Sequence, residues 1–154
     1  MSRGESWRTR LWRLGFNFFP AYRGTGARVA YIAGDWREIR VKLPLSWRTR
    51  NYVGTIFGGS MYGAIDPMYM LMLIKVLGPE YVVWDKTATI RFRRPGRRTL
   101  FATFVITEAD LAEIREGVAR AGKYEKEFPV HLADASGEVH AIFQKGVHVS
   151  RRDR

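Results

Sequence analysis

The 154-residue chain contains no cysteine, so neither disulfide bonds nor thiolate chemistry can contribute to its fold or its activity. Its histidines number only three, and they are not spaced as a metal-binding cluster: His131, His140 and His148. We therefore expect no metal. Acidic residues are also scarce, because 15 Asp and Glu stand against 26 Lys and Arg, giving a net charge of +11. Such a chain attracts nucleic acids, anionic lipids and phosphate-bearing ligands.

Several catalytic and nucleotide-binding signatures are missing as well. The sequence shows no Ser-His-Asp or Cys-His arrangement, no phosphate-binding P-loop and no dinucleotide fingerprint. The first residues lack the apolar core of a secretory signal. Their arginine content resembles a mitochondrial transit peptide, but a basic amphipathic helix on the domain surface is the favoured interpretation. Together with the absence of cysteine, this predicts a cytoplasmic protein.

Residues 6–19 are predicted to form that helix. Apolar residues recur at mostly helical spacing with arginines between them, and Pro20 ends the pattern. These apolar residues are Trp7, Leu11, Trp12, Leu14 and Phe18. We expect them to pack on the domain or on a partner subunit. Contact with a membrane surface is the alternative, because tryptophan beside basic residues suits a lipid interface.

Residues 58–77 are apolar on nearly every side, as in a buried helix, and Gly78-Pro79 ends the run. We expect one central helix here, with the rest of the domain wrapped around it. Asp66 and Pro67 interrupt the run, so the segment is too polar to span a membrane. Proline removes one helical hydrogen bond, which predicts a kink. A lone buried carboxylate is costly, so Asp66 needs a reason to be there.

Strand patterns surround this helix. Residues 37–43 alternate between apolar and basic side chains, and four more strands are predicted at 86–94, 99–107, 123–133 and 139–149. A short helix is expected within 108–122, and Pro129 places its strand at a sheet edge or at an irregularity. The whole chain, 1–154, is therefore predicted to be one α+β domain, with residues 1–30 forming an N-terminal helix and loop. Its antiparallel sheet of about five strands would wrap the central helix.

That order of elements resembles the hotdog fold, and one motif strengthens the likeness. Hotdog thioesterases of the phenylacetate-pathway type carry an asparagine, a glycine, a His-Gly-Gly and an acid, which Asn51, Gly54, Gly58-Gly59 and Asp66 match in spacing. The segments 93–95 and 134–141 also resemble that family. The segments 22–26 and 55–62 are similar to a hotdog subfamily catalogued only as a domain of unknown function. One departure is that Phe57 stands where the family has its histidine.

The resemblance implies an acyl-CoA thioesterase, with a coenzyme A thioester as substrate and no separate cofactor. In that role Asp66 activates water or attacks directly, and Asn51 orients water or the carbonyl. A helix start presents unpaired N–H groups, so the N–H of Gly59 would stabilise the oxyanion. Each residue also has a structural interpretation: Asp66 as a helix cap, the glycines as a packing contact, and Asn51 as a turn residue.

Residues around the helix start are predicted to bind the substrate: Phe57, Gly58, Ser60, Met61 and Tyr62. Met61 and Tyr62 would line an acyl tunnel, although both also suit the core. Arg93 and Arg94 would bind the phosphates of coenzyme A, because guanidinium groups bind phosphate in a bidentate fashion. A solvated basic surface is the alternative there.

Other functions compete with hydrolysis. A non-catalytic acyl-CoA-binding module would use the same pocket, and Phe57 in place of histidine favours it. A nucleic-acid binder is suggested by charge alone, but the basic residues are spread along the chain without a binding motif, so we do not expect one. A dehydratase would need a histidine in the central stretch. The resemblance implies a homodimer or homotetramer with sites between subunits.

Overall fold

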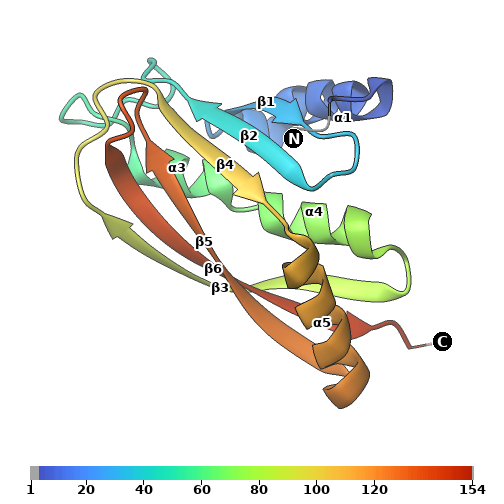
Figure 1. The fold of residues 1–154 in the computed structure, drawn as a ribbon. Coiled ribbons are helices and arrows are strands. Elements are labelled where there is room, and N and C mark those ends of the chain that lie inside the picture. Colours follow the sequence, from blue (N-terminus) through green and yellow to red (C-terminus); the bar gives the residue numbers. More distant parts are fainter. Residues whose placement is uncertain (1–3, 154) are drawn as a thin grey trace.

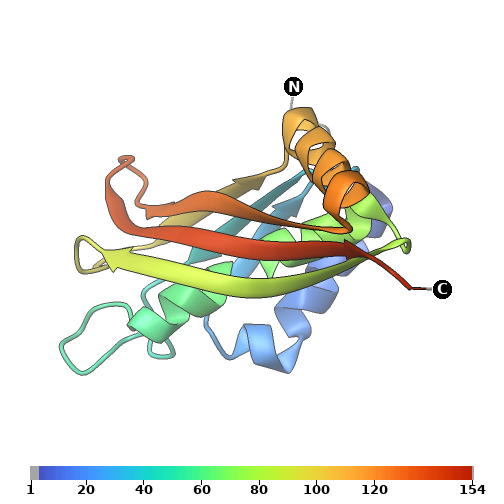
Figure 2. The ribbon, with the colours of Figure 1, turned by 90° about the horizontal axis from the view of Figure 1, so that it is seen from below.

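A computed structural model describes residues 4–153 and shows one curved antiparallel sheet around a central helical segment (Figures 1 and 2). The strands are β1 (Arg28–Ile32), β2 (Glu38–Leu43), β3 (Tyr81–Phe92), β4 (Leu100–Val105), β5 (Lys123–Ala133) and β6 (Val139–Arg151). They lie in the order β1-β2-β4-β5-β6-β3. This is the hotdog arrangement that the sequence predicts, with β3 and β1 at the two edges of the sheet.

The sheet has six strands among the described residues, and not about five, because β1 was not predicted and its first residues fall in the segment 1–30 that was expected to be helix and loop. A bulge between Val29 and Tyr31 shifts its register against β2, so its apolar residues do not alternate regularly. β3 likewise begins at Tyr81, five residues before the predicted start, and carries a bulge between Asp85 and Thr87. Both differences follow from bulges, which break the two-residue period used to recognise strands.

The central segment is two helices, α3 (Gly58–Ile65) and α4 (Met68–Leu77), and not one continuous helix over residues 58–77. The chain breaks at Asp66-Pro67 because Pro67 has no N–H to donate to the preceding turn. The buried Tyr22 hydroxyl donates a 2.9 Å hydrogen bond to the Ala64 carbonyl beside the break. The segment 22–26, which resembles the uncharacterised hotdog subfamily, therefore contacts the helix where it is interrupted.

The core lies between the concave face of the sheet and the helices α3 and α4 (Figure 1). Residues such as Met68, Met72 and Leu73 are fully buried there with Phe104 and Phe143 of the sheet. This packing explains why the helical segment is apolar on nearly every side.

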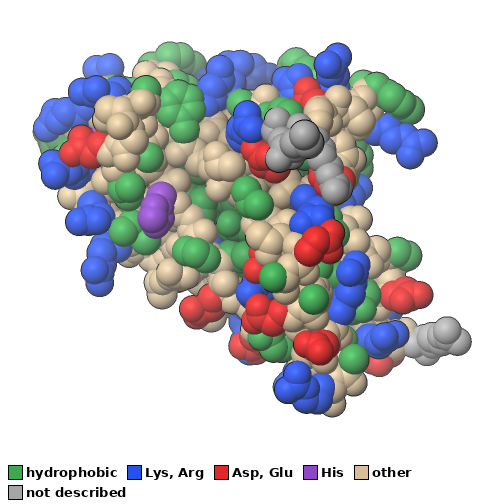
Figure 3. Space-filling model, viewed as in Figure 1, with side chains coloured by type: hydrophobic (Ala, Val, Ile, Leu, Met, Phe, Trp, Pro, Cys, Tyr) green, Lys and Arg blue, Asp and Glu red, His purple; other side chains and the backbone are tan. Residues whose placement is uncertain are grey.

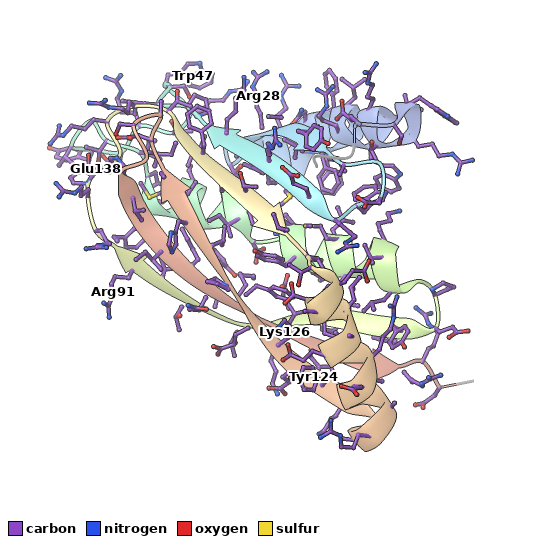
Figure 4. The ribbon with its side chains drawn as sticks, in the orientation of Figure 1. Arg28, Trp47, Arg91, Tyr124, Lys126 and Glu138 are labelled. Atoms are coloured by element: carbon purple, nitrogen blue, oxygen red, sulfur yellow. The ribbon has the colours of Figure 1, made fainter. Side chains whose placement is uncertain are left out.

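The helix α5 (Glu108–Ala121) connects β4 to β5 and packs on β5, where Tyr124 is labelled in Figure 4. Its first turn is closed by Thr107 and Asp110, each bonding to the backbone N–H of the other. β5 pairs with β6 along its length but with β4 only at Ala133. Pro129 therefore lies where β5 has a partner on one side only, as its missing N–H predicts.

The helices α1 (Trp7–Phe18) and the short α2 (Pro20–Arg23) precede the edge strand β1. The Asn17 side chain both donates to the Val29 carbonyl (3.0 Å) and accepts from its N–H (2.8 Å). The N-terminal helix is thus attached directly to the edge strand. Within residues 4–153, none of the helices combines the length and apolar character needed to cross a membrane.

Candidate functional site

A cavity of about 360 Å³ lies at the start of α3, between the loop before the helix and the turn after β3. Two backbone bonds hold its walls: Phe57 N–H donates to Thr49, and Ile56 N–H donates to Gly96. The Met61 methyl lies against Gly96 so closely that a Cβ added there would meet it at 3.0 Å. The cavity brings together five predicted site residues: Asn51, Gly58, Met61, Arg93 and Arg94.

The start of α3 carries free hydrogen-bond donors. Phe57 is the N-cap in an extended conformation, and its carbonyl accepts bonds from the N–H groups of Ser60 and Met61. Among residues 4–153, no acceptor reaches the N–H groups of Gly58 and Gly59. The helix dipole adds partial positive charge at this end, so the two N–H groups suit a developing oxyanion.

Both glycines lie close to aromatic rings. A Cβ on Gly58 would lie 3.2 Å from the Phe92 ring, and one on Gly59 would lie 2.5 Å from the Phe57 ring. Phe57 itself is largely exposed and lies beside Gly59. Phe57 therefore adds an apolar wall at the helix start, and its ring can neither donate nor accept a hydrogen bond.

Asn51 shapes the loop before α3. Its carbonyl oxygen accepts bonds from the N–H groups of Val53 (3.1 Å) and Thr55 (2.9 Å), and its amide donates to the Thr55 hydroxyl at 2.8 Å. Asn51 thus has the turn role that its sequence context also allowed. Asn51 therefore positions one wall of the cavity.

Asp66, at the break between α3 and α4, is not a lone carboxylate. Its Oδ1 accepts a 2.8 Å bond from the Tyr62 hydroxyl and a 3.0 Å bond from Lys145 Nζ. No donor among the described residues reaches Oδ2, and the side chain is 44% exposed. Burial and the bond to Asp66 raise the pKa of Tyr62, which keeps the phenol protonated as a donor. One oxygen is thus fixed while the other faces outward.

Lys145, in the middle of β6, is the residue of this site that the sequence prediction missed. Its side chain is only 1% exposed, and its Nζ also lies 3.4 Å from Asp85 Oδ1 on β3. Burial alone would lower the pKa of Lys145, but the bond to Asp66 and the charges of Asp85 and Asp66 raise it, so the ammonium persists. A signal was present: Phe143 and Val147 point inward, and Lys145 occupies the inward position between them.

Asp66 does not line the cavity at the helix start. Seven residues separate it from Gly59, which places it on nearly the same helix face but about 10 Å away along the axis. Water bound by Asp66 therefore cannot reach a carbonyl held at Gly59 of the same chain by direct contact. Tyr62 lies with Asp66, while Ser60 is buried within α3.

The turn that carries Arg93 and Arg94 is held by His140. The His140 carbonyl accepts bonds from both arginine N–H groups, and its buried ring lies between the Pro95 carbonyl (3.1 Å) and Asp134 (3.0 Å). The bond from Ser136 and that from His140 hold the pKa of Asp134 well below its ordinary value.

Asp134, Glu138 and His140 come close enough together to resemble a metal-binding group. Hydrogen bonds from the hairpin already occupy the Asp134 carboxylate, and Arg94 pairs with Glu138 at 2.7 Å. The group therefore fixes the turn. Both arginine side chains are exposed beside the cavity.

The profile of a protein family described as a domain of unknown function (DUF4442) matches residues 8–149, nearly the whole chain. The chain belongs to the DUF4442 family. The predicted resemblance to an uncharacterised hotdog subfamily is thereby confirmed. Among curated proteins, no sequence matches this DUF4442 chain.

Solved structures similar to this DUF4442 protein share its architecture. A Pseudomonas aeruginosa protein of unknown function, named a probable thioesterase, has a TM-score of 0.82 at 17% identity, covering 99% of this chain and 100% of that one. A Chlorobaculum tepidum protein of unknown function has a TM-score of 0.75 at 15% identity, covering 98% and 99%. A Haemophilus influenzae thioesterase has a TM-score of 0.69 at 12% identity, covering 98% and 96%. These likenesses confirm the thioesterase-like hotdog fold.

Proposed function

We propose that this protein is an acyl-CoA thioesterase in which Asp66 activates water and the N–H of Gly59 stabilises the oxyanion. The observation that carries the proposal is the pairing of two complementary features on one helical segment. Within the described residues 4–153, the helix start offers N–H groups without acceptors, and the break at Asp66 offers one carboxylate oxygen without a donor. A hydrolase needs both a group that holds negative charge and a group that takes a proton.

Because these features lie about 10 Å apart in one chain, we propose that each site uses two copies of the chain. β3 lies at the edge of the sheet and carries the exposed side chains of Trp84 and Phe92. Pairing of two β3 edges about a two-fold axis would lay the α3 helices side by side in opposite directions. The Gly59 end of one helix would then approach the Asp66 end of the other, in a homodimer or in a tetramer of such dimers.

The reaction follows from these positions. Asp66 Oδ2 takes a proton from water, the water oxygen bonds to the thioester carbon, and the carbonyl oxygen becomes an oxyanion held by Gly59 N–H. When the carbonyl re-forms, the carbon–sulfur bond breaks, and the thiolate takes the proton from Asp66. Free acid and free coenzyme A are the products. Arg93 and Arg94, exposed beside the cavity, would meet the phosphates of coenzyme A.

A binding module without turnover is the second candidate, and Phe57 favours it because a phenyl ring cannot polarise the carbonyl as a histidine can. The test is thiol release from a panel of acyl-CoAs with short, long and aromatic acyl groups, read alongside binding of the same compounds. Turnover of one class supports hydrolysis and names the substrate. Saturable binding without thiol release would replace the thioesterase proposal with the binding module.

A further inference from the structure

The helix α1 carries a second apolar face that the domain does not cover. Its outward side chains are between 48% and 68% exposed, and they recur every three or four residues: Trp7, Leu11, Leu14 and Phe18. At 100° per residue they fall within a narrow stripe along one side of the helix. The side toward the domain is formed by Thr9, which is buried, and by Phe16. The stripe is therefore on the opposite side, facing solvent.

Beside this stripe lies a cavity of about 570 Å³ between α1, the loop before β1 and the loop after β2. Leu14 and Phe18 of the stripe form one wall of it. No acidic residue lines the cavity, whereas four arginines do: Arg13, Arg23, Arg28 and Arg48. Arg13 is paired with Glu5, but within residues 4–153 no acidic partner reaches the other three. Positive charge and apolar surface thus adjoin.

Trp47 extends the same surface. Its side chain is 83% exposed and lies on the rim of the arginine-lined cavity, next to Arg28 in Figure 4. Figure 3 shows Lys and Arg side chains interspersed with hydrophobic ones along the upper margin of the molecule, where α1 and β1 lie. An exposed tryptophan beside arginines suits the boundary between lipid headgroups and acyl chains, where each part of these side chains finds a favourable environment.

We propose that α1 and the loop around Trp47 dock the protein on the surface of an anionic lipid bilayer. The stripe enters the boundary between headgroups and acyl chains, and the arginine-lined cavity receives lipid phosphate. The positive charge of this surface favours an anionic bilayer over a second copy of the chain as its partner. Arg8 and Arg10 flank the stripe and α1 has no acidic residue, so two such faces would bring like charges together. The inference is independent of the thioesterase proposal, because none of these residues belongs to that site.

The test is co-sedimentation of the intact protein with vesicles of phosphatidylcholine alone and of phosphatidylcholine mixed with phosphatidylglycerol. We expect binding to the mixed vesicles at least tenfold tighter than to the neutral ones, and its loss in high salt. The double variant Leu11→Ser/Phe18→Ser should bind about tenfold more weakly or worse, because both side chains would be buried in lipid. The control, Phe101→Ser with Val105→Ser, removes two comparably exposed apolar side chains on β4 and should leave binding unchanged.

Two further double variants, which lose the same number of positive charges, test the cavity. Arg23→Ala with Arg48→Ala should weaken binding to anionic vesicles about tenfold, while Arg115→Ala with Arg120→Ala on α5 should not. If both double variants lost vesicle binding equally, total charge and not the cavity would explain the binding, and the proposed surface would be overturned. Absence of vesicle binding by the wild type would overturn it as well. So would light scattering that shows Leu11→Ser with Phe18→Ser dissociating an oligomer, since a second copy would then occupy the stripe.

Discussion

Asp66→Asn is expected to lower kcat/KM for the best acyl-CoA by at least 100-fold, about 2.7 kcal/mol of transition-state stabilisation. The amide keeps the size of the carboxylate and an oxygen that Tyr62 can donate to, but it cannot take a proton from water. Because the side chain lies at the break between two helices and is 44% exposed, the fold should persist. Steady-state thiol release with purified protein, checked by circular dichroism, makes the measurement.

Asp85→Asn is the matched control for that variant. Asp85 is also paired with Lys145, but its side chain is only 24% exposed and its Oδ1 is buried. Removing its charge should therefore change kcat/KM by less than Asp66→Asn does. Equal losses in the two variants would show that the charge of the ion-pair group, and not a base at Asp66, supports activity.

Lys145→Met is expected to destabilise the protein by about 3 kcal/mol in urea unfolding at neutral pH. Methionine fills the space of the lysine stem, but it leaves Asp85 Oδ1 buried without a cation and removes a donor to Asp66. Lys126→Met on β5 is the control. Lys126 also pairs with two acids, Asp110 and Glu113, but at a more exposed site, where the loss should be about 1 kcal/mol or less (Figure 4). Similar losses in both variants would contradict the assigned importance of the buried pair.

The cost of Lys145→Met should shrink as the pH falls. Burial already raises the pKa of Asp85 against the opposing charge of Lys145, and without the lysine that pKa rises further. A carboxyl group with a raised pKa takes up a proton more readily in the folded state, so acidification favours folding of the variant. The urea unfolding curves of the wild type and of Lys145→Met should therefore lie closer together at mildly acidic pH than at neutral pH. A difference that grows toward acid would contradict this account of Asp85.

The hotdog architecture was predictable because its main elements carry clear periodicities. Residues 58–77 are apolar on nearly every side, and β2 alternates cleanly through Ile39, Val41 and Leu43. The first strand escaped prediction because its bulge breaks the alternation. The division of the central helix was foreshadowed by Pro67, but no local pattern predicts that the Tyr22 hydroxyl donates to the Ala64 carbonyl beside the break, forty-two positions further along the chain.

The candidate site was only half predictable. The glycines of the motif, Gly58 and Gly59, begin α3 and Asp66 caps its end, but no local pattern shows which side chain of the sheet reaches that carboxylate. Lys145 lies seventy-nine positions from Asp66, and it was detectable only as a charge at an inward position of β6. The bonds that commit Asn51 to its loop depend equally on tertiary structure.

The central claim is that each active site combines Gly59 of one copy with Asp66 of another. A mixed oligomer tests this claim most directly. Gly59→Pro removes one N–H donor in the first helical turn and displaces the exposed Phe57 ring that lies against Gly59, so it should cost at least about 10²–10³ in rate. When it is co-expressed with Asp66→Asn under a different tag and the mixed dimer is purified, one of the two shared sites has both native residues. We predict about half of the wild-type activity, although each variant alone is nearly inactive. A mixed dimer as inactive as its parents would contradict the account.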